Sequence, residues 1–250
     1  QGHSAPPNQA WIKKVLADLP NHQRKIKAAV LVHPTYQGYA NDPSDIINAL
    51  HQQGLSVLVD EAHGSHLAAA IDPDLPLSSL HCGADLVVHS LHKSAAGLAQ
   101  TAVLWLKGTR VDRERIERCL GWLQTTSPSA LLLASCESAV KQLSNPRGKR
   151  NLANRINEAR LIKSRLIKSG VPLIETQDPL RIVLHTGSAG ISGIDADTWF
   201  MKNGLIAELP EPGTLTFCLG LSKHRNLHSK ISRAWKKLLQ ANQNQSAQQD

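Results

Sequence analysis

The first half of the chain alternates short apolar runs with segments of helical periodicity. Apolar runs cover residues 30–33, 55–60, 85–90 and 100–106. Continuous apolar runs of this length are typical of strands that are buried on both faces of a sheet. Between the first two runs, Asp42 and Pro43 open a helical pattern that closes at Gly54. A strand, a helix and a second strand in this order indicate a parallel crossover.

The second half is mostly helical at first and then changes character. Helical periodicity occupies residues 111–123, 128–143 and 149–169, and short strands follow near 180–185, 205–208 and 215–219, with helices near 195–203 and 224–240. We therefore predict an α/β large domain with a mostly parallel sheet (1–148), a linking helix (149–170) and a small α+β domain (171–240). The polar residues 241–250 are predicted to be a disordered tail.

Amino-acid composition limits the functional classes to which the protein can belong. No window approaches the roughly 18 uninterrupted apolar residues that a membrane span requires, so we expect no membrane association. The four cysteines are scattered and no signal peptide is visible, which favours a reducing cytoplasm. The net charge of +8 is concentrated in helical segments with few aromatic residues. Solvated helix faces explain such charges, and we expect no nucleic-acid partner.

Polar groups stand at or just past the ends of three apolar runs: His33, the segment 60–63 and the segment 90–93. Ligands of open α/β sheets bind at the carboxyl ends of the strands. Lys93 follows a buried strand, where desolvation can free a lysine amine as a nucleophile. Asp60 ends an apolar run and needs a cationic partner or several hydrogen-bond donors to remain charged, and a protonated pyridine nitrogen is such a partner.

Two sequence motifs that contain these polar residues point to one family of enzymes. Asp-Glu-Ala-His-Gly occupies 60–64 and Ser-Leu-His-Lys occupies 90–93. Together they resemble the fold-type I Orn/Lys/Arg decarboxylases, which depend on pyridoxal 5'-phosphate (PLP). The resemblance continues through 34–38, 123–129 and 206–209, and it covers nearly the whole chain.

The resemblance implies a role for each matching residue. Lys93 would bind the cofactor as a Schiff base, and Asp60 would hold its pyridine nitrogen. His63 would lie beside the ring, while Ser90 and His92 would contact the phosphate. The implied reaction is α-decarboxylation of arginine, lysine or ornithine to an amine and carbon dioxide.

The resemblance also implies a homodimer or a higher homo-oligomer with the site between subunits. Thr126 or Ser127 would reach a phosphate across the dimer interface. An acidic side chain must meet the cationic end of the substrate, and Glu208 in the small domain is our candidate, with Glu211 as a second that is as readily a solvated surface residue.

The start of the chain departs from the family. The large domain of the family begins well before this chain and there supplies a phosphate turn with Ser or Thr and a group that stacks on the ring. Residues 1–27 contain no Gly-rich turn that opens a helix, and His3 and His22 lie in unpatterned sequence. We therefore expect a PLP-transferase-like large domain truncated at its N-terminus. A non-catalytic remnant of the fold that binds PLP weakly remains an alternative.

Three other hypotheses compete. Asp-Glu-Ala-His is also a helicase motif, but no Gly-x-x-x-x-Gly-Lys-Ser/Thr loop accompanies it. Asp60, His63 and His66 form a possible metal-ligand set, although we expect no metal. A PLP-dependent aminotransferase would need an arginine for the carboxylate of a second substrate, and Arg181 is a candidate.

Overall fold

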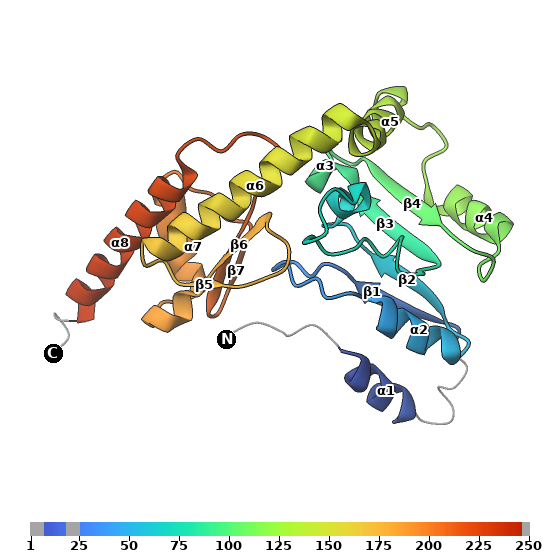
Figure 1. The fold of residues 1–250 in the computed structure, drawn as a ribbon, viewed down its shortest axis with the longest axis horizontal. Helices are drawn as coiled ribbons and strands as arrows, with labels where there is room; N and C mark the ends of the chain where they lie inside the picture. The colour runs from blue at the N-terminus through green and yellow to red at the C-terminus, as the bar shows by residue number, and fades with distance from the viewer. Residues whose placement is uncertain (1–7, 19–25, 247–250) are drawn as a thin grey trace. The chain divides into compact units, whose positions relative to one another are not determined.

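The computed structural model describes residues 8–18 and 26–246 (Figure 1). The chain divides into two compact units between Leu152 and Ala153, inside helix α6 (Pro146–Lys168). The first unit carries a four-stranded sheet in the order β1-β2-β3-β4, and the second carries a sheet in the order β5-β6-β8-β7. The predicted α/β fold class is confirmed.

The sheet of the first unit is mostly parallel. Strands β1 (Ala28–Val32), β2 (Ser56–Asp60) and β3 (Leu86–Ser90) run parallel, and β4 (Ala102–Leu106) pairs antiparallel with β3. The helices of this unit are α1 (Gln9–Ala17), α2 (Ser44–Gln52), α3 (Leu91–Ser94), α4 (Arg113–Leu123) and α5 (Ala130–Ser144), with a 3-10 helix η2 (Ser65–Ala69). The parallel strands bring their carboxyl ends to one edge.

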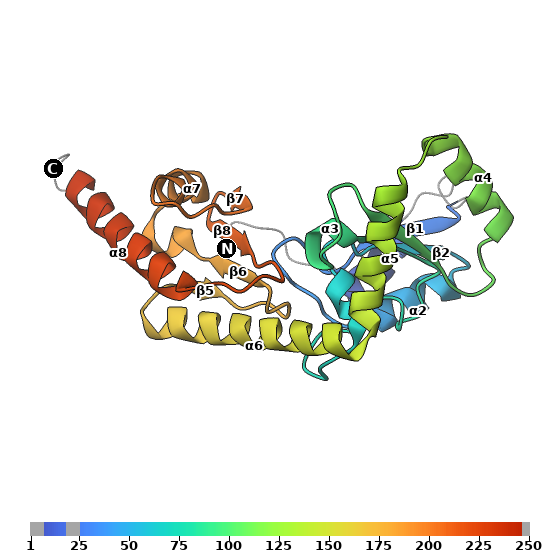
Figure 2. The same cartoon turned by 90° about the horizontal axis from the view of Figure 1, so that it is seen from above.

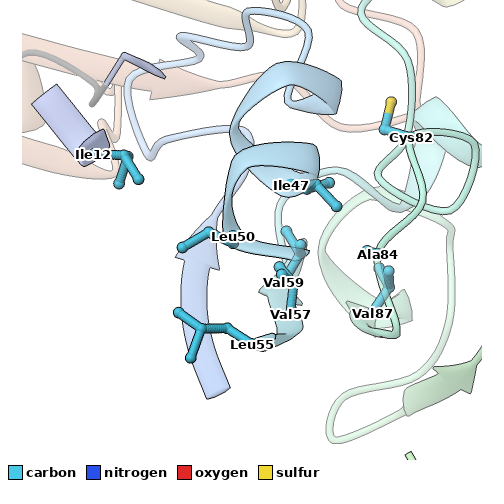
Figure 3. Close-up of a cluster of buried hydrophobic side chains, with 9 residues drawn as sticks. All are labelled: Ile12, Ile47, Leu50, Leu55, Val57, Val59, Cys82, Ala84 and Val87. Atoms are coloured by element: carbon cyan, nitrogen blue, oxygen red, sulfur yellow. The ribbon is translucent and has the colours of Figure 1, made fainter. Parts of the chain in front are cut away.

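The core of this unit lies between α2 and one face of the sheet (Figure 3). Ile47 and Leu50, one helical turn apart on α2, belong to the same buried cluster as Val57 and Val59 on β2. Helix α1, which sequence periodicity missed, adds Ile12 to this cluster. Its signal was the cap residue Asn8, whose side chain accepts from the backbone N–H of Trp11.

The prediction that each apolar run is buried on both faces is wrong for β1. Val30 and Val32 are 69% and 60% exposed, whereas Ala29 and Leu31 are partly buried and pack against the core cluster. Successive side chains of a strand point to opposite faces. Because α2 covers only one face, the side chains of Val30 and Val32 on the other face of β1 stay exposed among the described residues.

The second unit is an antiparallel sheet with helices. Its elements are β5 (Leu173–Ile174), β6 (Arg181–Leu184), η3 (Thr186–Ala189), α7 (Gly193–Lys202), β7 (Leu209–Glu211), β8 (Thr214–Cys218) and α8 (Leu227–Ser246). Helix α7 packs on β7, β8 and α8 (Figure 2). The strand predicted at 205–208 is wrong in place, since β7 begins at Leu209.

The segment 241–250 also differs from its prediction. Helix α8 continues to Ser246, and residues 247–250 lie outside the described part of the chain. Leu238 is buried, and the next turn places Ala241 and Asn242 half-buried beside α7. Packing against α7 thus extends the helix beyond the point where composition alone predicts disorder.

Lys163 is a half-buried cation in the second unit. Burial lowers its pKa to about 8, against a favourable interaction with Asp178, and its Nζ donates to the Asp178 carbonyl oxygen at 3.0 Å. The folded chain therefore loses the proton of Lys163 near pH 8, while the unfolded chain keeps it to about pH 10.4. Stability should rise through this window.

We predict that Lys163→Met raises the free energy of unfolding at pH 7 by on the order of 2 kcal/mol and removes most of the gain above pH 8. Urea unfolding at pH 7 and pH 9.5 measures both effects. Lys168→Met, an exposed lysine on the same helix, is the control and should change neither. A destabilised Lys163→Met chain at pH 7 would contradict the prediction.

Candidate active site

The carboxyl ends of three strands meet in register. Val32 pairs with Asp60, and Asp60 pairs with Val88, two residues before Ser90. Just past these ends, the backbone N–H of His33 donates to the carbonyl of Asp60 at 3.0 Å. The structure therefore places His33, Asp60 and Ser90, which the sequence singles out, along one sheet edge.

Lys93 and His63 lie in direct contact at this edge. Lys93 Nζ is 3.1 Å from Nε2 of His63, although the residues are thirty positions apart. An ammonium has no lone pair, so a charged Lys93 donates and His63 accepts. The His63 ring also packs against Tyr36, with ring centroids 4.2 Å apart. Two of the sequence-predicted site residues are thus brought together, with Tyr36 as an additional neighbour.

The Asp60 carboxylate is oriented by its own turn. Oδ1 accepts the backbone N–H of Ala62 at 3.0 Å, and the residue is exposed. Asp60 shares a sheet face with Leu58, while Val57 and Val59 face the core. The carboxylate is therefore held at one oxygen and open to a ligand.

Ser90 directly precedes the short helix α3, and His92 is the second residue of that helix. The Ser90 carbonyl accepts from Ser65 Oγ at 3.3 Å, and Ser90 makes no side-chain cap bond. His92 Nδ1 lies 3.0 Å from the carbonyl oxygen of Thr101. Because a carbonyl only accepts, His92 donates from Nδ1, and in a neutral ring this leaves Nε2 as an acceptor. A contact from His92 to an anion then needs the doubly protonated ring.

Glu61 is a functional candidate that the sequence reasoning missed. It is fully buried, its Oε1 lies 3.0 Å from His89 Nε2, and its Oε2 accepts the backbone N–H of Ser79 at 2.7 Å. Burial acts to raise the pKa of Glu61, but hydrogen bonds from His89, Ser78 and Ser79 outweigh it and leave the pKa below its ordinary value. The available signal was a second carboxylate directly after the strand-end Asp60.

Gly64 is required by close packing beside these groups. A Cβ at this position would lie 2.6 Å from Cγ of Glu61 and 2.6 Å from Cδ of Pro34. We predict that Gly64→Ala costs about 1–3 kcal/mol of unfolding free energy, because Glu61 is buried and cannot move away freely. Gly121→Ala, a helical site on α4 with open space, should be neutral or stabilising. Equal stability of both variants in urea unfolding would refute the packing argument.

The remaining candidates are found in the loop between α4 and α5 and in the second unit. Thr126 and Ser127 are exposed in the loop between α4 and α5. Glu208 is exposed in the second unit, and its backbone N–H donates to the carbonyl of Thr216 at 2.9 Å. Arg181, the aminotransferase candidate, is buried with its Nη1 3.9 Å from Oδ2 of Asp178.

The described residues were compared with the requirements of a metal site and of a membrane-spanning helix. Residues 8–18 and 26–246 contain no group of three or more His, Cys, Asp or Glu side chains placed to hold a metal ion, the set Asp60, His63 and His66 included. Over the same residues, no helix combines the length and the apolar character that a bilayer crossing needs.

Solved structures define the class of fold. The Francisella novicida lysine decarboxylase LdcF superposes with a TM-score of 0.75 at 17% identity, covering 94% of this chain and 39% of that one. The arrangement of a mostly parallel sheet followed by a small α+β unit is therefore that of the fold-type I PLP-dependent enzymes.

Sequence comparison then gives the family. The model described as "Orn/Lys/Arg decarboxylase, major domain" matches residues 4–201, and the chain belongs to this family. The Bacillus subtilis protein YaaO is 31% identical over 232 residues, covering 89% of this chain and 47% of its own length. Bacillus subtilis arginine decarboxylase is 31% identical over 202 residues, covering 76% and 40% respectively. The chain spans less than half the length of these curated relatives.

Proposed function

We propose that this chain is part or all of a PLP-dependent decarboxylase of a basic L-amino acid, either arginine, lysine or ornithine. The observation that carries the proposal is the contact between Lys93 Nζ and His63 Nε2 at the strand edge that also presents Asp60. A relative matched over 76% of the chain is named arginine decarboxylase, and a structural neighbour is a lysine decarboxylase.

The chemistry of these side chains fits PLP. A reachable primary amine suits its aldehyde, an exposed carboxylate suits its ring nitrogen, and a hydroxyl and an imidazole suit its phosphate. Lys93, Asp60, Ser90 and His92 would supply these groups in that order. His63 would lie beside the ring, as its packing against Tyr36 allows.

Each of these residues would have a separate role in the proposed decarboxylation. PLP, when bound, supplies the electron sink that lets carbon dioxide leave the α-carbon. Asp60 would hold the ring nitrogen in its protonated form, because a carboxylate favours a neighbouring positive charge. Lys93 would hold the cofactor through its side-chain amine. His63, bonded to Lys93 Nζ, holds the amine in place and can accept its proton.

A second copy of the chain would complete the site. Trp122 and Leu123, at the end of α4, are 80% and 85% exposed, and Leu131 and Leu133 on α5 are also exposed. Large exposed apolar side chains on neighbouring segments are common at protein interfaces. The loop between them carries Thr126 and Ser127, which in a homodimer would reach the phosphate in the partner's site.

The cationic end of arginine, lysine or ornithine needs a carboxylate, and Glu208 is an exposed candidate in the second unit. Glu211 is a weaker candidate because its Oε2 accepts from Thr214 Oγ1 at 3.0 Å.

The test combines cofactor binding with product formation. Purified chain is titrated with PLP and then assayed for carbon dioxide release from arginine, lysine and ornithine, with Bacillus subtilis arginine decarboxylase as positive control. Light scattering should report a dimer. Binding with release from one of the three amino acids is expected. PLP binding without release would redirect the work to transamination, and absence of binding would favour the non-catalytic alternative.

A further inference from the structure

Two buried side chains, His89 and Glu61, and the half-buried Trp105 form a hydrogen-bonded network behind the strand edge. Trp105 Nε1 lies 3.0 Å from His89 Nδ1, and His89 Nε2 lies 3.0 Å from Oε1 of Glu61. The other oxygen of Glu61 accepts the backbone N–H of Ser79. The side chains of His89 and Glu61 are at most 1% exposed, so water does not compete for these bonds.

The donor and acceptor in each of these hydrogen bonds follow from Trp105. An indole N–H can only donate, so Nδ1 of His89 must accept. The hydrogen of the neutral His89 ring therefore lies on Nε2 and is donated to Glu61. Trp105 thus selects the His89 tautomer that the Glu61 carboxylate needs.

These hydrogen bonds connect the strands that carry the candidate site. Trp105 belongs to β4, His89 to β3, and Glu61 follows the last residue of β2. Glu61 is the sequence neighbour of Asp60, and His89 is the neighbour of Ser90. Because neighbours along a strand point to opposite faces, Glu61 and His89 each have a candidate cofactor residue on the other side of the backbone.

We propose that Trp105, His89 and Glu61 are positioning residues that fix the ends of β2 and β3 and thereby the directions of Asp60 and Ser90. The role as positioning residues of a cofactor site rests on the proposed function, whereas the ordering of the strand ends does not. Trp105 lies outside both sequence motifs on which the family resemblance rests, which are residues 60–64 and 90–93.

Two near-isosteric variants test the ordering in the full chain without cofactor. Glu61→Gln cannot accept on both sides, so either His89 Nε2–H or Ser79 N–H loses its acceptor. Trp105→Phe removes the donor and keeps most of the ring packing. We expect amide hydrogen exchange to accelerate about tenfold at Ala62, which bonds Oδ1 of Asp60, and at Glu61, which bonds the Val88 carbonyl.

The matched control is a second pair of a histidine and a carboxylate, which is partly buried and lies at the start of β3. His51 Nε2 lies 2.9 Å from Oδ2 of Asp85, which also accepts the backbone N–H of Val57. His51→Gln should lower stability and accelerate exchange near Val57, leaving Ala62 unchanged. If all three variants accelerate exchange equally at Ala62, or none does, the positioning role is overturned.

Nitrogen-15 spectra of labelled histidines test the direction of these hydrogen bonds independently. The signal that disappears in His89→Gln should show a hydrogen on Nε2 and none on Nδ1. A hydrogen on Nδ1 would exclude the Trp105 bond and overturn the proposal.

Cofactor binding then links the ordering to the site. Glu61→Gln and Trp105→Phe should weaken PLP binding about tenfold and change the visible band of the bound cofactor, while His51→Gln should alter neither. If the unmodified chain binds no PLP, the proposed function fails, and the exchange and nitrogen spectra still decide whether the strand ends are ordered as proposed. Normal PLP affinity in both variants would overturn the cofactor part of the role.

Discussion

Replacing Lys93 with alanine is expected to abolish the visible absorption band that PLP gains on bonding to a lysine amine. Lys93 is the amine next to His63 at the strand edge, at 3.1 Å, and alanine offers no nucleophile. Added PLP should remain spectrally free, and carbon dioxide release should fall to background. Absorption spectra of the chain with equimolar PLP measure the first effect.

The control for this variant is another exposed lysine with one hydrogen bond. Lys107 Nζ donates to the Leu80 carbonyl oxygen at 2.6 Å, and the Lys107 backbone N–H bonds Asp85 at the start of β3. Lys107→Ala should keep the band. A band that persists in Lys93→Ala would exclude Lys93 as the attachment point, and a band lost in both variants would indicate a fold defect.

Asp60→Asn is expected to retain cofactor attachment and to reduce turnover about 100-fold, the equivalent of a lost charge-assisted hydrogen bond near 3 kcal/mol. The amide keeps the oxygen that accepts the Ala62 N–H, so the local turn should survive. What it loses is the negative charge that holds a proton on the ring nitrogen. Steady-state assays and PLP spectra together separate the two effects.

Asp72→Asn is the matched control because Asp72 makes the same two-residue turn. Its Oδ1 accepts the backbone N–H of Asp74 at 2.9 Å, in the loop after η2. This variant should keep both the spectrum and the rate. Near-normal turnover by Asp60→Asn would remove Asp60 from the mechanism.

The strands and the site motifs could be predicted because their signals are local. Apolar runs marked β1 to β4, and the positions of Asp60, His63 and Lys93 followed from strand ends and a family resemblance. The contact between Lys93 and His63 depends on the register of β2 against β3, which the sequence does not state. Glu61 was not predicted from the sequence, because burial of a carboxylate is favourable only when donors from distant parts of the sequence bond to it.

Burial was harder to predict than secondary structure. An apolar run is the same whether one or both faces of its strand are covered, and the exposed Val30 and Val32 show that the residues described by the structure cover only one face of β1. The helical residues beyond 240 were missed for a related reason, since their polar composition hides the support that α7 gives to Leu238 and Ala241.

The adjacent carboxylates Asp60 and Glu61 limit how this gene can change. One must face a ligand and the other must meet His89 inside the protein, and the pleat of the strand assigns these directions by odd and even position. A single-codon insertion or deletion within 56–60 would exchange the two, burying the open carboxylate and exposing the bonded one. Substitutions in β2 can be gradual, but changes in its length cannot, so length variation among homologues should be confined to the connecting loops.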